Sequence, residues 1–160
     1  PKTYEILKKV PFLTFAEITI LEPHSDILPH IGETNTTMRG HLGLSIPGPL
    51  PEAGIEVNQK QRSWEEGKIV LFSDAHHHRV WNHTSKRRMV LVFDVIKEEY
   101  QNKAQWYCAQ ALSTLVIKGI DSKKPIIKIM PKWIQKGLHY IISSVWYIYL
   151  PIQNKISWLP

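Results

Sequence analysis

Short runs of alternating apolar and polar residues occupy the first hundred positions of the chain. The run "FAEITIL" at 15–21 has the two-residue period of a half-buried strand and is followed by Pro23, which ends it. Further strand-like runs, separated by segments rich in Pro, Gly and polar residues, lie at 41–46, 55–57, 68–72 and 88–95. No helix-length periodic segment separates these runs, so the pattern predicts an antiparallel sandwich or barrel.

Beyond residue 97 the pattern changes from strand-like to helical. Residues 98–119 contain no proline, are rich in Ala, Gln and Leu, and end in Gly119, which predicts a helix with its C-cap at that glycine. Residues 123–152 mix lysines with Ile, Trp and Tyr, and their uncharged run at 137–154 contains polar residues and a proline, which makes a poor membrane-spanning helix. We therefore expect an all-β core at 1–97 and a helical extension at 98–160.

Charge follows the same division. Residues 1–99 hold 12 Lys and Arg against 13 Asp and Glu, whereas residues 100–160 hold 8 Lys against Asp121 alone. A basic segment rich in Trp and Tyr either packs on the core or lies at a membrane surface, so 120–160 is a candidate for peripheral membrane contact. We expect no nucleic-acid partner, because no recognition motif accompanies the lysines.

Cysteine usage and the first residue bear on the cellular context. Cys108 is the only cysteine, which excludes an internal disulfide and a cysteine-based zinc site and favours a reducing compartment. We therefore expect a cytoplasmic protein, with membrane association as an option. Since the chain begins with Pro1 and no signal sequence opens it, we expect a fragment or a processed product whose upstream part could hold an anchor.

The histidines gather close to the ends of the expected strands. Neutral imidazoles that converge from different strands can hold one metal ion, although a run of three histidines is also compatible with a solvated turn. Alternation along a strand lets at most His76 and His78 share a face, so His77 should point away. The members of this set are His30, His41, His76, His77, His78 and His83.

Arg88 lies ten residues after His78, on the strand that follows a hairpin through "NHTSK". This spacing would return its guanidinium to the same end of the sheet as His78, where it could bind a carboxylate through two parallel hydrogen bonds. The alternative is a surface arginine, because Lys86, Arg87 and Arg88 form a basic turn. Spacing alone favours the surface position.

Four linked motifs carry a resemblance to a known family. "HIGETNTTMRGHLGL", "WEEGK", "FSDAHHHRVWN" and "RMVLVFDV" occur in the order and spacing of the aspartyl/asparaginyl β-hydroxylase family. Members of that family are Fe(II)- and 2-oxoglutarate-dependent dioxygenases, and the resemblance implies a double-stranded β-helix, the jelly-roll fold of cupins. It extends from about residue 15 to residue 95 and implies nothing about residues 100–160.

The resemblance also implies roles for individual residues. The first and second iron ligands correspond to His30 and His78. The residues that contact the cosubstrate correspond to Arg39 and His41, and the arginine that binds its distal carboxylate corresponds to Arg88. A cosubstrate-binding hydroxyl falls at Thr19.

Two positions depart from the commonest pattern of such sites. Most non-haem iron oxygenases carry an acid two positions after the first histidine, where this chain has Gly32. The peptide β-hydroxylases resemble this chain in having glycine there, which leaves two protein ligands, whereas lipid A hydroxylases tend to carry the acid. Thr37 replaces a basic residue that helps the peptide hydroxylases hold an acidic substrate. Asp74 could orient an imidazole, but we expect a solvated residue at a strand end.

The resemblance implies hydroxylation with Fe(II), 2-oxoglutarate and O2. The expected substrate is the β-carbon of an Asp- or Asn-like unit, in a peptide, an amino-acid derivative or a small acid. One alternative is hydroxylation of a lipid acyl chain, of the lipid A type, at a membrane surface. The other is a non-catalytic cupin-like binding module.

Overall fold

The computed structural model describes residues 2–123 and 125–156. It divides into two compact units, Pro1–Glu99 and Tyr100–Pro160. The first unit is built from strands and the second from helices, in agreement with the change of pattern near residue 97.

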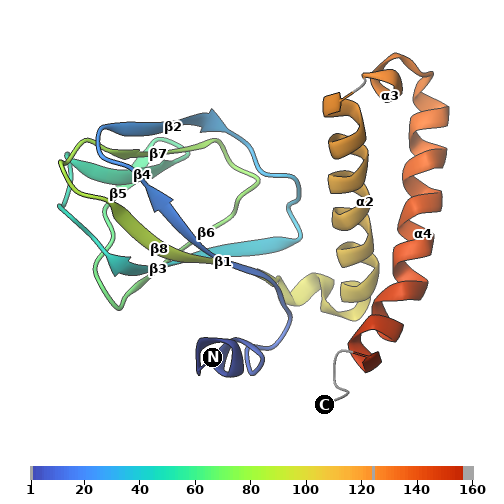
Figure 1. Cartoon of the computed structure of the whole chain (residues 1–160), viewed down its shortest axis with the longest axis horizontal. Coiled ribbons are helices and arrows are strands. Elements are labelled where there is room, and N and C mark those ends of the chain that lie inside the picture. The colour runs from blue at the N-terminus through green and yellow to red at the C-terminus, as the bar shows by residue number, and fades with distance from the viewer. Residues whose placement is uncertain (1, 124, 157–160) are drawn as a thin grey trace. The chain divides into compact units, whose positions relative to one another are not determined.

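The first unit is a double-stranded β-helix, as the resemblance implied. A short helix, α1 (Lys2–Leu7), precedes eight strands arranged in two four-stranded antiparallel sheets with the orders β1-β8-β3-β6 and β2-β7-β4-β5 (Figure 1). The strands are β1 (Leu13–Leu21), β2 (Ser25–His30), β3 (Thr37–Ser45), β4 (Ala53–Val57), β5 (Lys60–Arg62), β6 (Ile69–Phe72), β7 (His78–Asn82) and β8 (Arg88–Ile96).

The core lies between the two sheets. Arg88, Val90, Val92 and Asp94 alternate along β8 and are buried, whereas Met89, Phe93 and Val95 are only partly buried; Leu91, on the opposite face, is also buried. Side chains from both sheets and from the loop before β6 form one apolar cluster, whose buried members are Leu21, Ile55, Trp64, Phe72, Val80, Val90 and Val92. The same alternation therefore carries both the core and two charged side chains into the interior.

Two strands do not follow from the hydrophobic pattern. In β2, "SDILPH", five of the six residues are exposed, and Pro29 is tolerated because β2 is an edge strand. All three residues of β5 are exposed, and this strand lies at the other edge of the same sheet. Neither edge strand buries an apolar face, so the backbone hydrogen bonds to the neighbouring strand decide its conformation.

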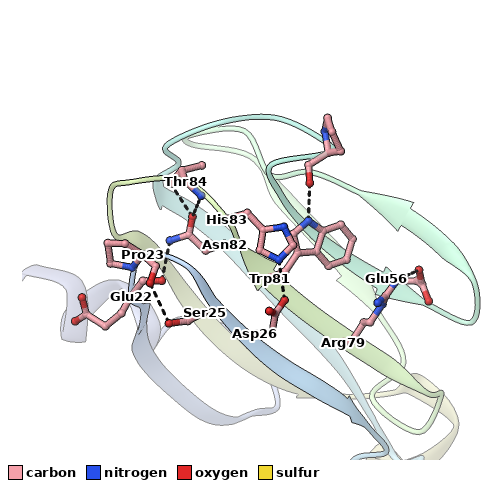
Figure 2. Close-up of polar contacts among 11 residues, drawn as sticks. Glu22, Pro23, Ser25, Asp26, Glu56, Arg79, Trp81, Asn82, His83 and Thr84 are labelled. Carbon is pink, nitrogen blue, oxygen red and sulfur yellow. Dashed lines mark hydrogen bonds and ion pairs between the residues drawn. The ribbon is translucent and has the colours of Figure 1, made fainter.

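Asn82 holds the start of β2 against the end of β7. Its side chain is fully buried, and its Nδ2 donates to the carbonyl oxygens of Leu21, Glu22 and Lys86 at 2.8 to 3.1 Å. Its Oδ1 accepts from the hydroxyl of Thr84 at 2.8 Å (Figure 2). This network joins the turn after β1 to the β7–β8 hairpin, and Ser25 pairs with Asn82 in the register of β2 and β7. The same register ends with His30 opposite His78.

The second unit is a helical hairpin. A 3-10 turn (Glu98–Lys103) leads into α2 (Ala104–Lys123), which is followed by α3 (Ile126–Ile129) and α4 (Lys132–Ile156). Small buried residues, Ala109 and Ser113 on α2 and Ser143 on α4, line the contact between the two long helices. The hydroxyls of both serines donate to the carbonyl oxygen of His139, at 3.1 Å from Ser113 and 2.7 Å from Ser143.

The prediction that the first of these helices ends at Gly119 is wrong, because α2 continues to Lys123. A Cβ atom at position 119 would meet nothing within 4 Å, so no close contact there requires a glycine. Within the described ranges, no helix combines the length and the apolar character that crossing a bilayer requires.

Candidate active site

His30 and His78 lie opposite each other on paired strands, β2 and β7. Their ring centroids are 4.1 Å apart and the rings are inclined by 54°. His78 is buried, with 4% of its surface exposed, whereas His30 is exposed at the edge of the sheet. The structure therefore brings together the two residues that the resemblance assigned to a metal, with one of them open to solvent.

Both rings direct Nδ1 toward a backbone carbonyl of their own chain segment. Nδ1 of His30 lies 2.9 Å from the carbonyl oxygen of Leu28, and Nδ1 of His78 lies 2.9 Å from that of His76. Because a carbonyl oxygen only accepts, each Nδ1 carries the proton and each neutral ring keeps a lone pair on Nε2. A histidine fixed in this tautomer by a backbone carbonyl is the usual arrangement of a metal ligand.

Asp74 is buried next to these rings, with 4% exposure, so the expectation of a solvated residue at a strand end is wrong. Its Oδ1 lies 3.1 Å from Nε2 of His78, and its Oδ2 lies 3.1 Å from Nη1 of Arg39. A lone pair on Nε2 and a carboxylate oxygen repel each other, so a proton or a metal cation at Nε2 makes this contact favourable. Burial opposes charge on His78, but the hydrogen bonds to Asp74 and to the His76 carbonyl outweigh it and raise the pKa of His78.

Gly32 is explained by the position of Asp74. The backbone N–H of Gly32 donates to the carbonyl oxygen of Asp74 at 2.8 Å, and a Cβ atom at position 32 would overlap the Asp74 carboxyl group. A carboxylate from the loop before β7 therefore fills the space that a side chain two residues after His30 would need. An acid at position 32 and Asp74 in its present place exclude each other.

Arg39 is held by two carboxylates. Its Nε and Nη2 donate to the two oxygens of Asp94, each at 2.8 Å, and the Asp74 contact completes the set. The hydrogen bond to Asp94 outweighs the desolvation of the guanidinium, and the pKa of Arg39 is raised. The sequence did not single out Asp94, although its alternation with Arg88, Val90 and Val92 in "RMVLVFDV" places it on the inward face.

Arg88 is buried, with 2% exposure, so it is not a surface residue of a basic turn. Its Nη1 donates to the hydroxyl of Thr19 at 3.3 Å, and its guanidinium carbon lies 4.7 Å from the centre of the Trp64 ring. Within the described part of the chain it pairs with no carboxylate, and its Nε has no hydrogen-bond partner. Burial lowers the pKa of Arg88 to about 10, so the group remains a cation at neutral pH.

His41 lies among these residues as a buried neutral ring. Its exposure is 6%, and it packs edge-on against Phe72 with the ring centroids 5.1 Å apart. Burial, and then the charges of Arg88 and Arg39, lower the pKa of His41 to about 3. Its Nδ1 has no hydrogen-bond partner among residues 2–123 and 125–156.

The buried polar side-chain atoms that lack a hydrogen-bond partner all belong to this region of the described structure. Such atoms are costly unless a ligand, an ion or water completes them. They are Nδ1 of His41, Nε1 of Trp64, Nε of Arg88 and Oδ1 of Asp74, which gains a hydrogen bond from Nε2 of His78 when that nitrogen is protonated. Together with Nε2 of the exposed His30 and Nε2 of the buried His78, they suit a divalent cation and an anionic ligand with several oxygen atoms.

His30 and His78 are the two imidazoles that meet at this site. Within residues 2–123 and 125–156, no group of three or more His, Cys, Asp or Glu side chains is arranged to hold a metal. His76 and His77, the other members of the histidine run, are exposed. Of the residues named from the sequence, Thr19, His41 and Arg88 lie on β1, β3 and β8 of one sheet. His30 and His78 lie on β2 and β7 of the other sheet.

Comparison with known proteins shows the family of the chain. Residues 1–98 match the family model described as aspartyl/asparaginyl beta-hydroxylase. The chain belongs to this family.

Two curated relatives share about a hundred residues with the chain. An ornithine lipid ester-linked acyl 2-hydroxylase from Rhizobium tropici is 41% identical over 97 residues, which cover 61% of this chain and 34% of the relative. The human aspartyl/asparaginyl beta-hydroxylase is 36% identical over 100 residues, covering 59% of this chain and 13% of the relative. The chain thus spans about a third of the first relative and about an eighth of the second.

Among solved structures, the cupin domain of a transcriptional regulator from Enterobacter cloacae has a TM-score of 0.44 and 13% identity. This likeness covers 52% of the present chain and 81% of the other.

Replacement of Gly32 by alanine tests the packing of Asp74. Because the added Cβ overlaps the carboxyl group, we expect Gly32→Ala to lower the free energy of unfolding by about 2 to 4 kcal/mol, as overpacking at buried sites does. Urea denaturation of the full chain measures this value. Adding Asp74→Gly should restore part of the loss, and Gly137→Ala, at a position surrounded by open space, should cause none. A Gly32→Ala protein as stable as the parent would contradict the proposed packing.

The buried neutral His41 predicts a pH dependence of stability. Its pKa is about 3 in the folded protein and near 6.5 in the unfolded chain, so only the unfolded chain takes up the proton between these values. Stability should therefore fall by about 1.4 kcal/mol per pH unit as the pH drops below 6.5.

Urea denaturation of metal-free protein at about pH 7.5 and about pH 4.5 measures this loss. The loss should be about 2.5 kcal/mol smaller in His41→Gln than in the parent. His77→Gln, which replaces an exposed histidine, serves as the control. Equal losses in His41→Gln and the parent would show that His41 is not buried as a neutral ring.

Proposed function

We propose that the sheet unit is an Fe(II)- and 2-oxoglutarate-dependent hydroxylase. The observation that supports this most directly is Arg88, a buried cation. Among the described residues it has no carboxylate partner, and its buried Nε has no hydrogen-bond acceptor. A guanidinium in this state needs an anion, since an uncompensated buried charge is strongly unfavourable. The distal carboxylate of 2-oxoglutarate matches the guanidinium in charge and in planar geometry.

The side chains around Arg88 position this carboxylate. Thr19 accepts a hydrogen bond from Nη1, and Trp64 packs on the guanidinium plane, so the arginine has little freedom to turn. Orientation of this kind lowers the entropy cost of placing the cosubstrate. His41 stays neutral, and its Nδ1 is available for a hydrogen bond to an oxygen of the cosubstrate.

His30 and His78 would hold Fe(II) through Nε2, since both Nδ1 atoms face backbone carbonyls. The bound metal would supply the activation of O2, which is chemistry that amino-acid side chains cannot perform. Asp74 brings a negative charge beside His78, and the Asp94–Arg39 pair holds that carboxylate in place. In this proposal the main role of Arg39 is to hold the Asp74 carboxylate in place. A contact between Arg39 and the cosubstrate stays a prediction.

We propose that the substrate is the acyl chain of a lipid, and that an Asp- or Asn-like unit is the second candidate. This reverses the order of preference expected from the sequence. Leu28 and Ile31 flank His30 and are 76% and 50% exposed, which suits an apolar substrate. Arg39 is already paired with two carboxylates, and Thr37 is uncharged, so neither offers a cation to an acidic substrate. The lipid hydroxylase from Rhizobium tropici among the relatives supports the same choice.

The cofactor assignment is tested by anaerobic titration with Fe(II) and 2-oxoglutarate. We expect a metal-to-ligand charge-transfer absorption band in the parent protein and none in His78→Ala, because one histidine cannot complete the centre. Arg88→Ala should weaken 2-oxoglutarate binding by a factor of ten or more, since truncating a buried charged hydrogen-bond partner costs about 2 to 5 kcal/mol.

His77→Ala removes an exposed neighbouring histidine and should keep the full band. Absence of the band in the parent would refute the oxygenase assignment.

The substrate assignment is tested by mass spectrometry of candidate substrates after incubation with enzyme, Fe(II), 2-oxoglutarate and O2. We expect one added oxygen atom on an ester-linked acyl lipid. Leu28→Ser should raise KM for this lipid by about tenfold, which corresponds to the loss of one buried leucine contact. Leu71→Ser, at an exposed position on β6, is the matched control. Oxygen addition to an Asp- or Asn-containing peptide, with the lipid unchanged, would instead establish the peptide substrate.

A further inference from the structure

The end of the hairpin around α3 concentrates the positive charge of the helical unit. Residues 118–136, here called the basic tip, contain six of the eight lysines found between residues 100 and 160, and one acid, Asp121. In the described part of the tip, Lys118, Lys128, Lys132 and Lys136 are exposed. The tip joins the end of α2 to the start of α4, so these lysines lie close together although they are spread along the sequence.

The acid of the tip is directed inward, and among the lysines it pairs with Lys128. Asp121 is 6% exposed, and its Oδ1 accepts hydrogen bonds from the backbone N–H groups of Ile127 and Lys128 at 3.0 and 3.3 Å. Nζ of Lys128 lies 3.6 Å from the other carboxylate oxygen. The carboxylate therefore fixes the start of α3, and the outer surface of the tip is left with an excess of positive charge.

Large apolar side chains project from the same short segment. Ile126, Ile129 and Trp133 are 48%, 82% and 75% exposed, within eight residues of chain. Exposure of this kind is costly in water unless a partner covers it. Aliphatic side chains beside a tryptophan and surrounded by lysines match the boundary between headgroups and acyl chains of a bilayer, where Trp is enriched and Lys meets phosphate.

A groove beside the tip has the same mixed character. It has a volume of about 440 Å³ and lies between α2 and α4. Its walls include the apolar side chains of Trp106, Ile117, Ile127 and Tyr140 and the polar groups of Lys136 and His139. An apolar floor with a basic edge suits the acyl chain and the anionic headgroup of one lipid.

We propose that the basic tip docks on an anionic lipid surface, with Ile129 and Trp133 entering the interface and the lysines contacting lipid phosphates. The exposed aliphatic side chains favour a lipid over a nucleic acid, which has no acyl region to receive them. Residues 100–160 also contain no arginine, the residue best suited to bidentate recognition of nucleic acids. This docking does not depend on iron or on the substrate of the sheet unit.

Vesicle flotation of the full chain tests the proposal. We expect binding to vesicles that contain phosphatidylglycerol, weak binding to pure phosphatidylcholine vesicles, and a decline with added salt. Lys132→Ala combined with Lys136→Ala should weaken binding by about 30-fold, because each lysine near an anionic surface contributes roughly a factor of five. Ile129→Ser combined with Trp133→Ser should weaken binding at every salt concentration, since it removes the apolar contribution.

The control variants place the same changes on the sheet unit. Lys60→Ala combined with Lys86→Ala, and Ile6→Ser, alter exposed residues outside the tip and should bind like the parent. No binding of the parent to phosphatidylglycerol vesicles would overturn the proposal, as would equal binding by the tip variants. Self-association without vesicle binding would overturn it in favour of pairing through the exposed α4 residues Ile141, Val145 and Ile148. Retention by RNA or DNA without vesicle binding would assign the lysines to nucleic acid instead.

Discussion

The candidate active site depends on the antiparallel pairing of β2 with β7. This pairing places His30 opposite His78, and in each case a carbonyl two residues earlier on the same chain segment faces Nδ1. The two Nε2 atoms are therefore oriented by backbone geometry before any metal binds. Asn82 secures the other end of the same strand pair by binding three carbonyl oxygens from the neighbouring turns. The position of the two rings thus rests on hydrogen bonds that the sheet unit already requires in order to fold.

Charge balance inside the sheet unit distinguishes two arginines that look equivalent in the sequence. Arg39 is balanced by Asp94 and Asp74, while Arg88 is buried against Thr19 and Trp64 and pairs with no carboxylate of the described residues. A balanced pair holds its neighbours in place, whereas an unbalanced buried cation attracts an anion. Neutral His41 adds no positive charge between them. In the proposed function, one dicarboxylate would bind Arg88 and leave the ion pairs that hold Asp74 in place.

The two units differ in net charge. The sheet unit is nearly neutral in sequence, while the helical unit carries eight lysines against one acid. A hydroxylase that acts on an acyl chain needs access to lipid, and a basic surface with exposed Ile and Trp supplies a means of reaching it. The proposed substrate and the proposed membrane contact are nevertheless independent, because one concerns the residues around His30 and the other concerns the basic tip.

The sequence by itself determined the fold class, the change from strands to helices near residue 97, and the candidate residues His30, His41, His78 and Arg88. Local alternation and linked motifs carry this information, since both are written along a single stretch of chain. Only the tertiary structure decided the conformation of the edge strand β2, the burial of Asp74 in the space beside Gly32, and the pairing of Arg39 with Asp94. Each of these depends on residues from different strands meeting in the interior, and such contacts leave no periodic signal in the sequence.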